Sequence, residues 1–137
     1  MSYLTVIPTS VAAGSAATVK SVTAAAAIIA GDLLYKPTAS TVDVADASDS
    51  AAKAKVVGIA LNGGAVGQPI AFQISGQINL GATLVVGTTY VSDGTGNPGK
   101  IGPEADLGSG DFPTILGIAI STALLELNIQ AGGIAKP

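Results

Sequence analysis

The chain has 137 residues, which is enough for one domain with a real core but not for two. Hydrophobic residues make up 48% of it, charged residues only 11%, and the net charge is −3. Histidine, cysteine, arginine and tryptophan are absent from the sequence. Zinc sites, cysteine hydrolases, Ser-His triads and disulfides are therefore excluded, and the negative charge disfavours binding to a nucleic-acid backbone.

The hydropathy pattern predicts no membrane span and no leader segment. The longest uninterrupted apolar run covers only residues 24–30, whereas a helix that crosses a bilayer needs about 20 apolar residues. The first residues also lack the basic region and apolar core of a signal peptide. We therefore expect a soluble, unprocessed protein without a membrane partner.

Residues 1–20 are apolar, rich in Ser and Thr, and broken by Pro8. Because they lack a helical period, they favour an extended N-terminal arm, although a disordered terminus or an edge strand would share this pattern. An arm laid on a neighbouring subunit would explain why several apolar side chains occur where they would otherwise face water. The interface predicted from this argument consists of Tyr3, Leu4, Val6 and Ile7.

From residue 18 onward, short β-branched runs alternate with Gly, Pro, Asn, Asp and Ser clusters, which is typical of an all-β sandwich or barrel. Two short stretches have helical alternatives, the alanine-rich residues 24–30 and the stretch 48–55, where Ser48 would cap a turn. Strands are predicted at residues 18–23, 28–35 with a break at 31–32, 41–44, 56–61, 70–75, 77–80, 84–86, 90–92, 114–121 and 124–130.

The chain contains an internal repeat, because three short patterns recur in the same order. The expected fold is therefore all-β, a small β-barrel or sandwich built from two similar halves with an extended N-terminal arm. Residues 21–137 form the single β domain in this interpretation, with repeats at about 28–80 and 84–134. The paired patterns are Ala30–Tyr35 with Val86–Tyr90, Val57–Leu61 with Leu116–Ile120, and Phe72–Ile74 with Leu127–Ile129.

Two motifs resemble ligand sites but lack essential parts of them. Residues 94–100 match the start of a phosphate-binding loop, yet Ile101 replaces the Ser or Thr that would hold magnesium, and Pro98 removes an amide donor. Asp43, Asp46 and Asp49 could suggest calcium, but the spacing is not that of an EF-hand. We therefore predict no cofactor and no metal, with a solvated loop as the better account of the aspartates.

Catalytic carboxylate pairs are not favoured either. Glu126 alternates with leucines, as an outward residue on a half-buried strand should, and Glu104 lies in a Pro/Gly loop. No serine occupies a Gly-x-Ser-x-Gly turn. We expect that the protein is not an enzyme and that Tyr35 and Tyr90, which the repeat places at equivalent positions, are packing residues.

The repeat patterns resemble the capsid decoration, or cement, proteins of tailed bacteriophages. The Val-Gly-Ile strand, followed by a strand that ends in Ser-Gly, is also similar to part of the head decoration proteins of lambdoid phages, although these are not evidently duplicated in this way. The resemblance spans residues 18–134 and rests on short glycine-based patterns: Ala30–Tyr35, Val57–Leu61, Gly67–Ile70 and Ile74–Gly76.

This resemblance implies a structural virion protein on the outer surface of the capsid. Such a protein would assemble as a homotrimer, bind neighbouring subunits of the major capsid protein and clamp them together, with residues 1–20 contacting the shell. The alternative is a receptor- or carbohydrate-binding module of a phage fibre or baseplate, which exposed aromatic side chains would favour. A fragment of an enzyme scaffold is a third reading, but it requires a ligand pocket that the sequence does not reveal.

Overall fold

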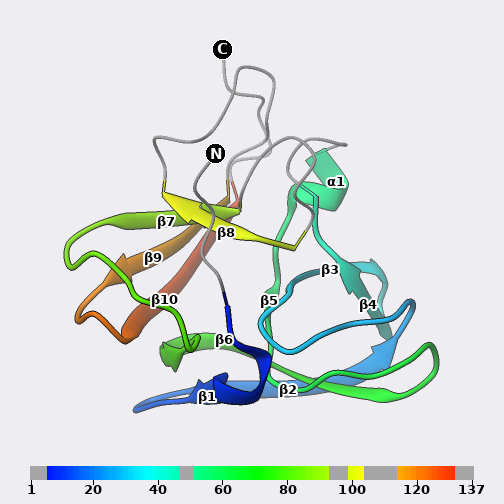
Figure 1. Cartoon of the computed structure of the whole chain (residues 1–137). Coiled ribbons are helices and arrows are strands. Elements are labelled where there is room, and N and C mark those ends of the chain that lie inside the picture. The colour runs from blue at the N-terminus through cyan, green and yellow to red at the C-terminus, as the bar shows by residue number, and fades with distance from the viewer. Residues whose placement is uncertain (1–5, 47–50, 93–98, 104–113, 132–137) are drawn as a thin grey trace.

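The structure is a computed structural model that describes residues 6–46, 51–92, 99–103 and 114–131 (Figure 1). Strands dominate these residues, because β-branched runs are separated by turn-forming residues throughout. The elements in chain order are η1 (Pro8–Ser10), β1 (Ala12–Ala13), β2 (Thr18–Ala24), β3 (Leu33–Thr38), β4 (Thr41–Val44), α1 (Ala51–Ala54), β5 (Gly58–Ala60), β6 (Pro69–Asn79), β7 (Thr89–Ser92), β8 (Ile101–Pro103), β9 (Thr114–Ala119) and β10 (Leu124–Ala131).

The first half of the chain forms a small closed barrel, seen on the right of Figure 1. Its strands follow the order β2-β4-β3-β5-β6, and β2 also pairs with β6, which closes the ring. All of these pairings are antiparallel except the one between β2 and β4. The predicted all-β small barrel is therefore confirmed.

The second half repeats the strand pairings of the first half on the left of Figure 1. Strand β7 pairs with β8 and β9, and β9 pairs with β10, as β3 pairs with β4 and β5, and β5 with β6. The long strand β6 belongs to both halves, because its second part pairs with β10. No ladder joins β8 to β6 among the described residues, so this half is an open version of the barrel.

The backbone hydrogen bonds repeat along with the strands. Gly31 N–H donates to the carbonyl oxygen of Ala60 at 2.8 Å, and Gly87 N–H donates to that of Ala119 at 2.9 Å. Both glycines have positive φ, 93° and 83°, a conformation that glycine adopts without a steric penalty. The two similar halves that the sequence predicts are thus present in the hydrogen-bonding pattern itself.

The ladder registers correct two of the predicted equivalences. Leu34 lies opposite Gly58, and Tyr90 lies opposite Gly117, so Tyr90 corresponds to Leu34 and not to Tyr35. The two tyrosines match in sequence only across a one-residue difference in spacing, because Tyr35 lies four residues after Gly31 and Tyr90 three after Gly87. Phe72 likewise corresponds to Leu125 and not to Leu127, since the two lie opposite Ala60 and Ala119. This second difference is two residues, so the matched side chains still lie on the same face of the strand.

Two clusters of buried side chains form the core. The smaller one fills the closed barrel. The larger one joins the outer face of that barrel to the inner face of the second half, and so it closes the open side of the second half with side chains from the first. The smaller cluster contains Ala24, Ile28, Leu34, Val42, Ala60, Ile70 and Phe72, and the larger contains Leu33, Ala45, Val56, Ile59, Ile78, Leu80, Leu84, Tyr90, Ile101, Leu116, Ala119, Leu125 and Leu127.

Several strand predictions differ from the structure in detail. The predicted break between residues 70–75 and 77–80 is absent, because Gly76 adopts a positive φ of 89° inside a continuous β6. Residues 84–86 are not a strand, and β8 was not predicted. The alanine-rich residues 24–30 are not helical, whereas the helical alternative for 48–55 is observed as one turn, α1.

Candidate interaction surface

The predicted N-terminal interface is partly described by the structure. Tyr3 and Leu4 lie outside the described residues. Val6 is half-buried and packs against the larger core cluster, while Ile7 remains 48% exposed. The segment is held to its own chain, because Ile7 N–H donates to the carbonyl oxygen of Leu80 at 3.2 Å. The structure thus places an anchored Val6 beside an exposed Ile7.

The segment beyond Ile7 runs along the second part of β6. Strand β1 pairs antiparallel with β6, and Gly14 N–H donates to the carbonyl oxygen of Gln77 at 2.7 Å. The predicted boundary between arm and domain, at residue 20, falls inside β2, which closes the barrel. Residues 18–20 are therefore structural parts of the barrel.

A second apolar surface, which no sequence pattern indicated, lies on the outer face of β9 and on the residue that follows it. Ile115, Ile118 and Ile120 are 39%, 49% and 45% exposed, and we call them the isoleucine stripe. The buried Gly117 interrupts the usual alternation of the strand, so that both Ile115 and Ile118 face outward. Exposed polar side chains of β10 flank the stripe, and with Ile115 and Ile118 they line a groove of about 260 Å³: these are Glu126, Asn128 and Gln130.

A larger groove, of about 370 Å³, lies where the two halves meet. We call it the lysine groove, because the exposed residues Lys20 and Lys36 lie at an otherwise aliphatic and aromatic lining. The other lining residues are Val56, Val57, Phe72, Ile74 and Ile129.

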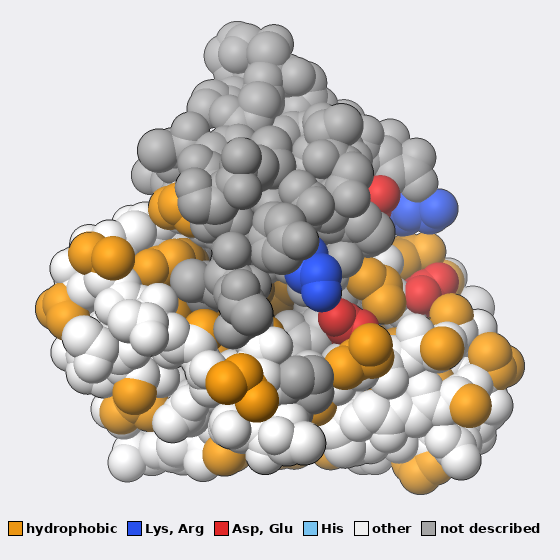
Figure 2. Space-filling model, viewed as in Figure 1, with side chains coloured by type: hydrophobic (Ala, Val, Ile, Leu, Met, Phe, Trp, Pro, Cys, Tyr) orange, Lys and Arg blue, Asp and Glu red, His pale blue; other side chains and the backbone are white. Residues whose placement is uncertain are grey.

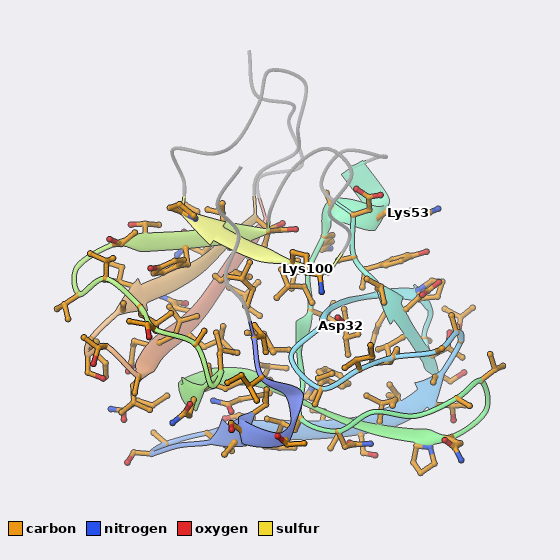
Figure 3. All side chains as sticks on the ribbon, viewed as in Figure 1. Asp32, Lys53 and Lys100 are labelled. Atoms are coloured by element: carbon orange, nitrogen blue, oxygen red, sulfur yellow. The ribbon has the colours of Figure 1, made fainter. Side chains whose placement is uncertain are left out.

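Charged side chains are few on the face that Figure 2 shows, and hydrophobic ones are spread over it. Asp32 is partly buried and lies near Lys100. Its burial raises the pKa above the ordinary value of 3.8, although the Ile29 N–H, which donates to Oδ2 at 3.0 Å, and Lys100 oppose that shift. Figure 3 shows Asp32 below Lys100 at the front of the molecule.

The two motifs that resemble ligand sites are only partly described by the structure. Of the stretch 94–100, which resembles a phosphate-binding loop, the structure describes Gly99 and Lys100. Both lie beside Asp32. Asp43 accepts a hydrogen bond from the Val44 N–H at 2.7 Å, and Asp49 lies outside the described residues. Among residues 6–46, 51–92, 99–103 and 114–131, no group of three or more His, Cys, Asp or Glu side chains could hold a metal ion.

The tyrosines and glutamates can be compared with their predicted roles. Tyr90 is a core residue, and its hydroxyl accepts a hydrogen bond from the Val85 N–H at 3.0 Å. Tyr35 is partly buried against the same cluster, so both act as packing residues. Glu126 is exposed between two buried leucines, as predicted, and Glu104 lies outside the described residues.

No family model and no curated protein sequence matches this chain. The resemblance to phage decoration proteins therefore rests on the short patterns described above. Neither helical segment in the described part of the chain, η1 or α1, has the length and hydropathy to cross a membrane.

Proposed function

We propose that this chain is a structural virion protein that binds the outer surface of a tailed-phage head. In this proposal it stabilises the expanded shell by clamping neighbouring subunits of the major capsid protein. The chain binds the assembled lattice and not its separated subunits, so binding shifts the equilibrium toward the intact shell.

The observation that carries the proposal is the way the N-terminal segment presents Ile7. Val6 packs against the core and a backbone hydrogen bond holds the segment to Leu80, directly after β6, so the exposed Ile7 side chain has a defined position on the surface. A preorganised aliphatic contact loses little conformational entropy on binding. The low charge of the chain also favours apolar and backbone contacts over charge-driven binding.

The carbohydrate-binding alternative has less support among the described residues. Sugar sites use exposed aromatic rings, but Tyr90 is 3% exposed, Phe72 is 1% exposed, and Tyr35 packs partly against the core. We therefore retain the decoration function as the proposal and treat glycan binding as an outcome to be tested.

The direct test is a sedimentation assay of the purified chain with empty, expanded heads of the tailed phage whose genome encodes it. We expect saturable binding at a fixed ratio to the major capsid protein, and heads that are disrupted at a higher temperature. Unexpanded heads and free capsid subunits are the controls. Equal binding to free subunits, or competable binding to a glycan array without head binding, would contradict the proposal.

The contribution of the N-terminal segment is tested by Ile7→Ser and by deletion of residues 1–5. A deletion of residues 1–20 is less informative, because it also removes β1 and the beginning of β2. Ile7→Ser should weaken head binding by about tenfold, the effect of losing roughly 1.4 kcal/mol. Val19→Ser is the matched control, because Val19 is 47% exposed on β2, and head binding should not change. Undiminished binding of both N-terminal variants would remove the segment from the clamp.

A further inference from the structure

The internal repeat shows that one aliphatic surface occurs twice in this molecule but is covered only once. In the first half, Ile59 lies opposite Leu33 on β3 and opposite Gln73 on β6. In the second half, Ile118 lies opposite Thr89 on β7 and opposite Glu126 on β10. Ile118 is therefore the structural counterpart of Ile59.

The whole isoleucine stripe has aliphatic counterparts in the first half. Counting from the paired glycines, Gly58 and Gly117, the counterparts of Ile115, Ile118 and Ile120 are Val56, Ile59 and Leu61. Val56 and Ile59 are 3% and 0% exposed, and Leu61 packs partly against the same cluster. The second half covers them with side chains that include Leu116, Leu125 and Leu127.

The flanking polar residue differs between the two halves in a way that follows from this coverage. Gln73, which lies beside the covered stripe, is fully buried and neutral, and its Nε2 donates to the carbonyl oxygens of Ser75 and Gln77 at 3.0 and 2.8 Å. Its counterpart Glu126 is charged and exposed. A carboxylate beside an apolar contact requires a cationic partner if it is to be covered, because burying an unpaired charge is costly.

The lysine groove has the complementary character. Lys20 and Lys36 bring positive charge to a lining that includes Val57, Ile74 and Ile129. None of the groove residues belongs to the stripe or to its polar flank, so one copy of the chain can present both surfaces at once. Such a head-to-tail contact is heterologous and closes into a ring when the rotation between copies allows it.

We propose that the isoleucine stripe of one copy binds the lysine groove of a second copy, with Glu126 facing Lys20 and Lys36. The contact covers, between two molecules, the stripe whose first-half counterpart the second half covers within one molecule. It deepens the proposed function, on which it rests only for the expectation that the ring contains three copies. Its test contains no capsid, so its failure is distinguishable from a failure of head binding.

The test is the molar mass of the pure chain, measured by light scattering after size exclusion over a range of concentrations. We expect the wild-type mass to rise above that of a monomer and to reach a limit at a closed ring. Ile118→Ser should weaken association at least tenfold, whereas Val66→Ser, which alters a 69% exposed valine between β5 and β6, should not. Both variants should retain the wild-type circular dichroism spectrum.

Charge exchange identifies the second surface. Glu126→Lys alone, and Lys20→Glu with Lys36→Glu, should each weaken association, and the chain that carries all three changes should associate like the wild type. Added salt should weaken the wild-type contact, because the charge pairs lie at its rim. A wild-type chain that stays monomeric, a mass unaffected by Ile118→Ser, or a triple variant that does not recover association would each overturn the proposal.

Discussion

At the scale of single residues, Gly117 has the strictest requirement for its type. A Cβ atom there would overlap the carbonyl oxygen of Glu126 on the neighbouring strand, and the φ of 155° adds backbone strain for any other residue. The close approach of β9 and β10 and the outward direction of Ile118 both depend on the missing side chain. A glycine inside an otherwise apolar strand is typical of a bulge or of close backbone contact, and Gly117 makes such a contact.

Gly117→Ala should therefore destabilise the fold by about 3 kcal/mol or more, since the clash is with backbone and cannot be relieved by a rotamer change. Gly87→Ala is the control, because its φ is 83° but a Cβ there would meet nothing within 4 Å. That variant should lose only the cost of a left-handed conformation, about 1–2 kcal/mol. Urea unfolding of the two variants measures the difference, and equal losses would contradict the proposed close contact.

Asp32 links stability to pH. Burial raises the pKa of its carboxyl group above 3.8, so the folded chain holds this proton more tightly than the unfolded chain does. Between pH 3.8 and the raised pKa, the contribution of Asp32 to stability therefore falls as pH rises. Asp32→Asn keeps an acceptor for the Ile29 N–H but removes the charge.

We expect Asp32→Asn to gain stability relative to the wild type as pH rises through this window, and the difference to become constant above it. Urea unfolding at a series of pH values is the measurement. A difference between variant and wild type that stays the same across the series would show that Asp32 is not desolvated in the folded chain.

At the scale of elements, most of the strands were predictable because β-branched runs and turn residues alternate along the chain. Strand β8 was not predicted, because Ile101–Pro103 contains only one β-branched residue and directly follows the glycine-rich residues 94–100. The break predicted at Gly76 was wrong for a different reason. Glycine with positive φ often ends a strand. Here β2 pairs with the first part of β6 and β10 with the second, so β6 continues through Gly76.

Buried and exposed side chains alternate along β10, so substitutions on its two faces should have different effects on stability. Leu125 is fully buried and lies opposite Ile78, while Glu126 points outward. Leu125→Ala should cost about 2–5 kcal/mol, because it removes core contacts and leaves a cavity. Glu126→Ala, in dilute solution, should change stability by no more than about 0.5 kcal/mol. Thermal unfolding of both variants distinguishes this register from one displaced by a single residue, which would exchange the two effects.

At the scale of the whole molecule, the two halves cannot be separated without exposing core. They share β6, and the larger cluster contains side chains of both, such as Leu33 and Ile59 with Leu116. The Thr114 hydroxyl also donates to the carbonyl oxygen of Ala54, which joins β9 to α1. The two halves therefore form one structural unit with a shared core.

This predicts a single unfolding transition. Ile59→Ala, at the contact between the halves, should lower the midpoint for amides of β3 and for amides of β9 equally, because neither half keeps its core alone. Residue-resolved NMR signals during urea unfolding provide the measurement, with far-UV circular dichroism as a second probe. Loss of β3 signals at one midpoint and β9 signals at another would contradict the shared core.

By itself, the sequence determined the all-β class, the duplication and the positions of the glycine turns, because these depend on local periodicity and on backbone conformations that only glycine adopts readily. It did not determine which of two equivalent aliphatic surfaces is covered. Val56, Ile59 and Leu61 are as apolar as Ile115, Ile118 and Ile120, so no local pattern separates them. Only the tertiary structure decided this, because the first half closes as a barrel whose outer face packs against the second half, whereas the outer face of the second half stays exposed at Ile115, Ile118 and Ile120.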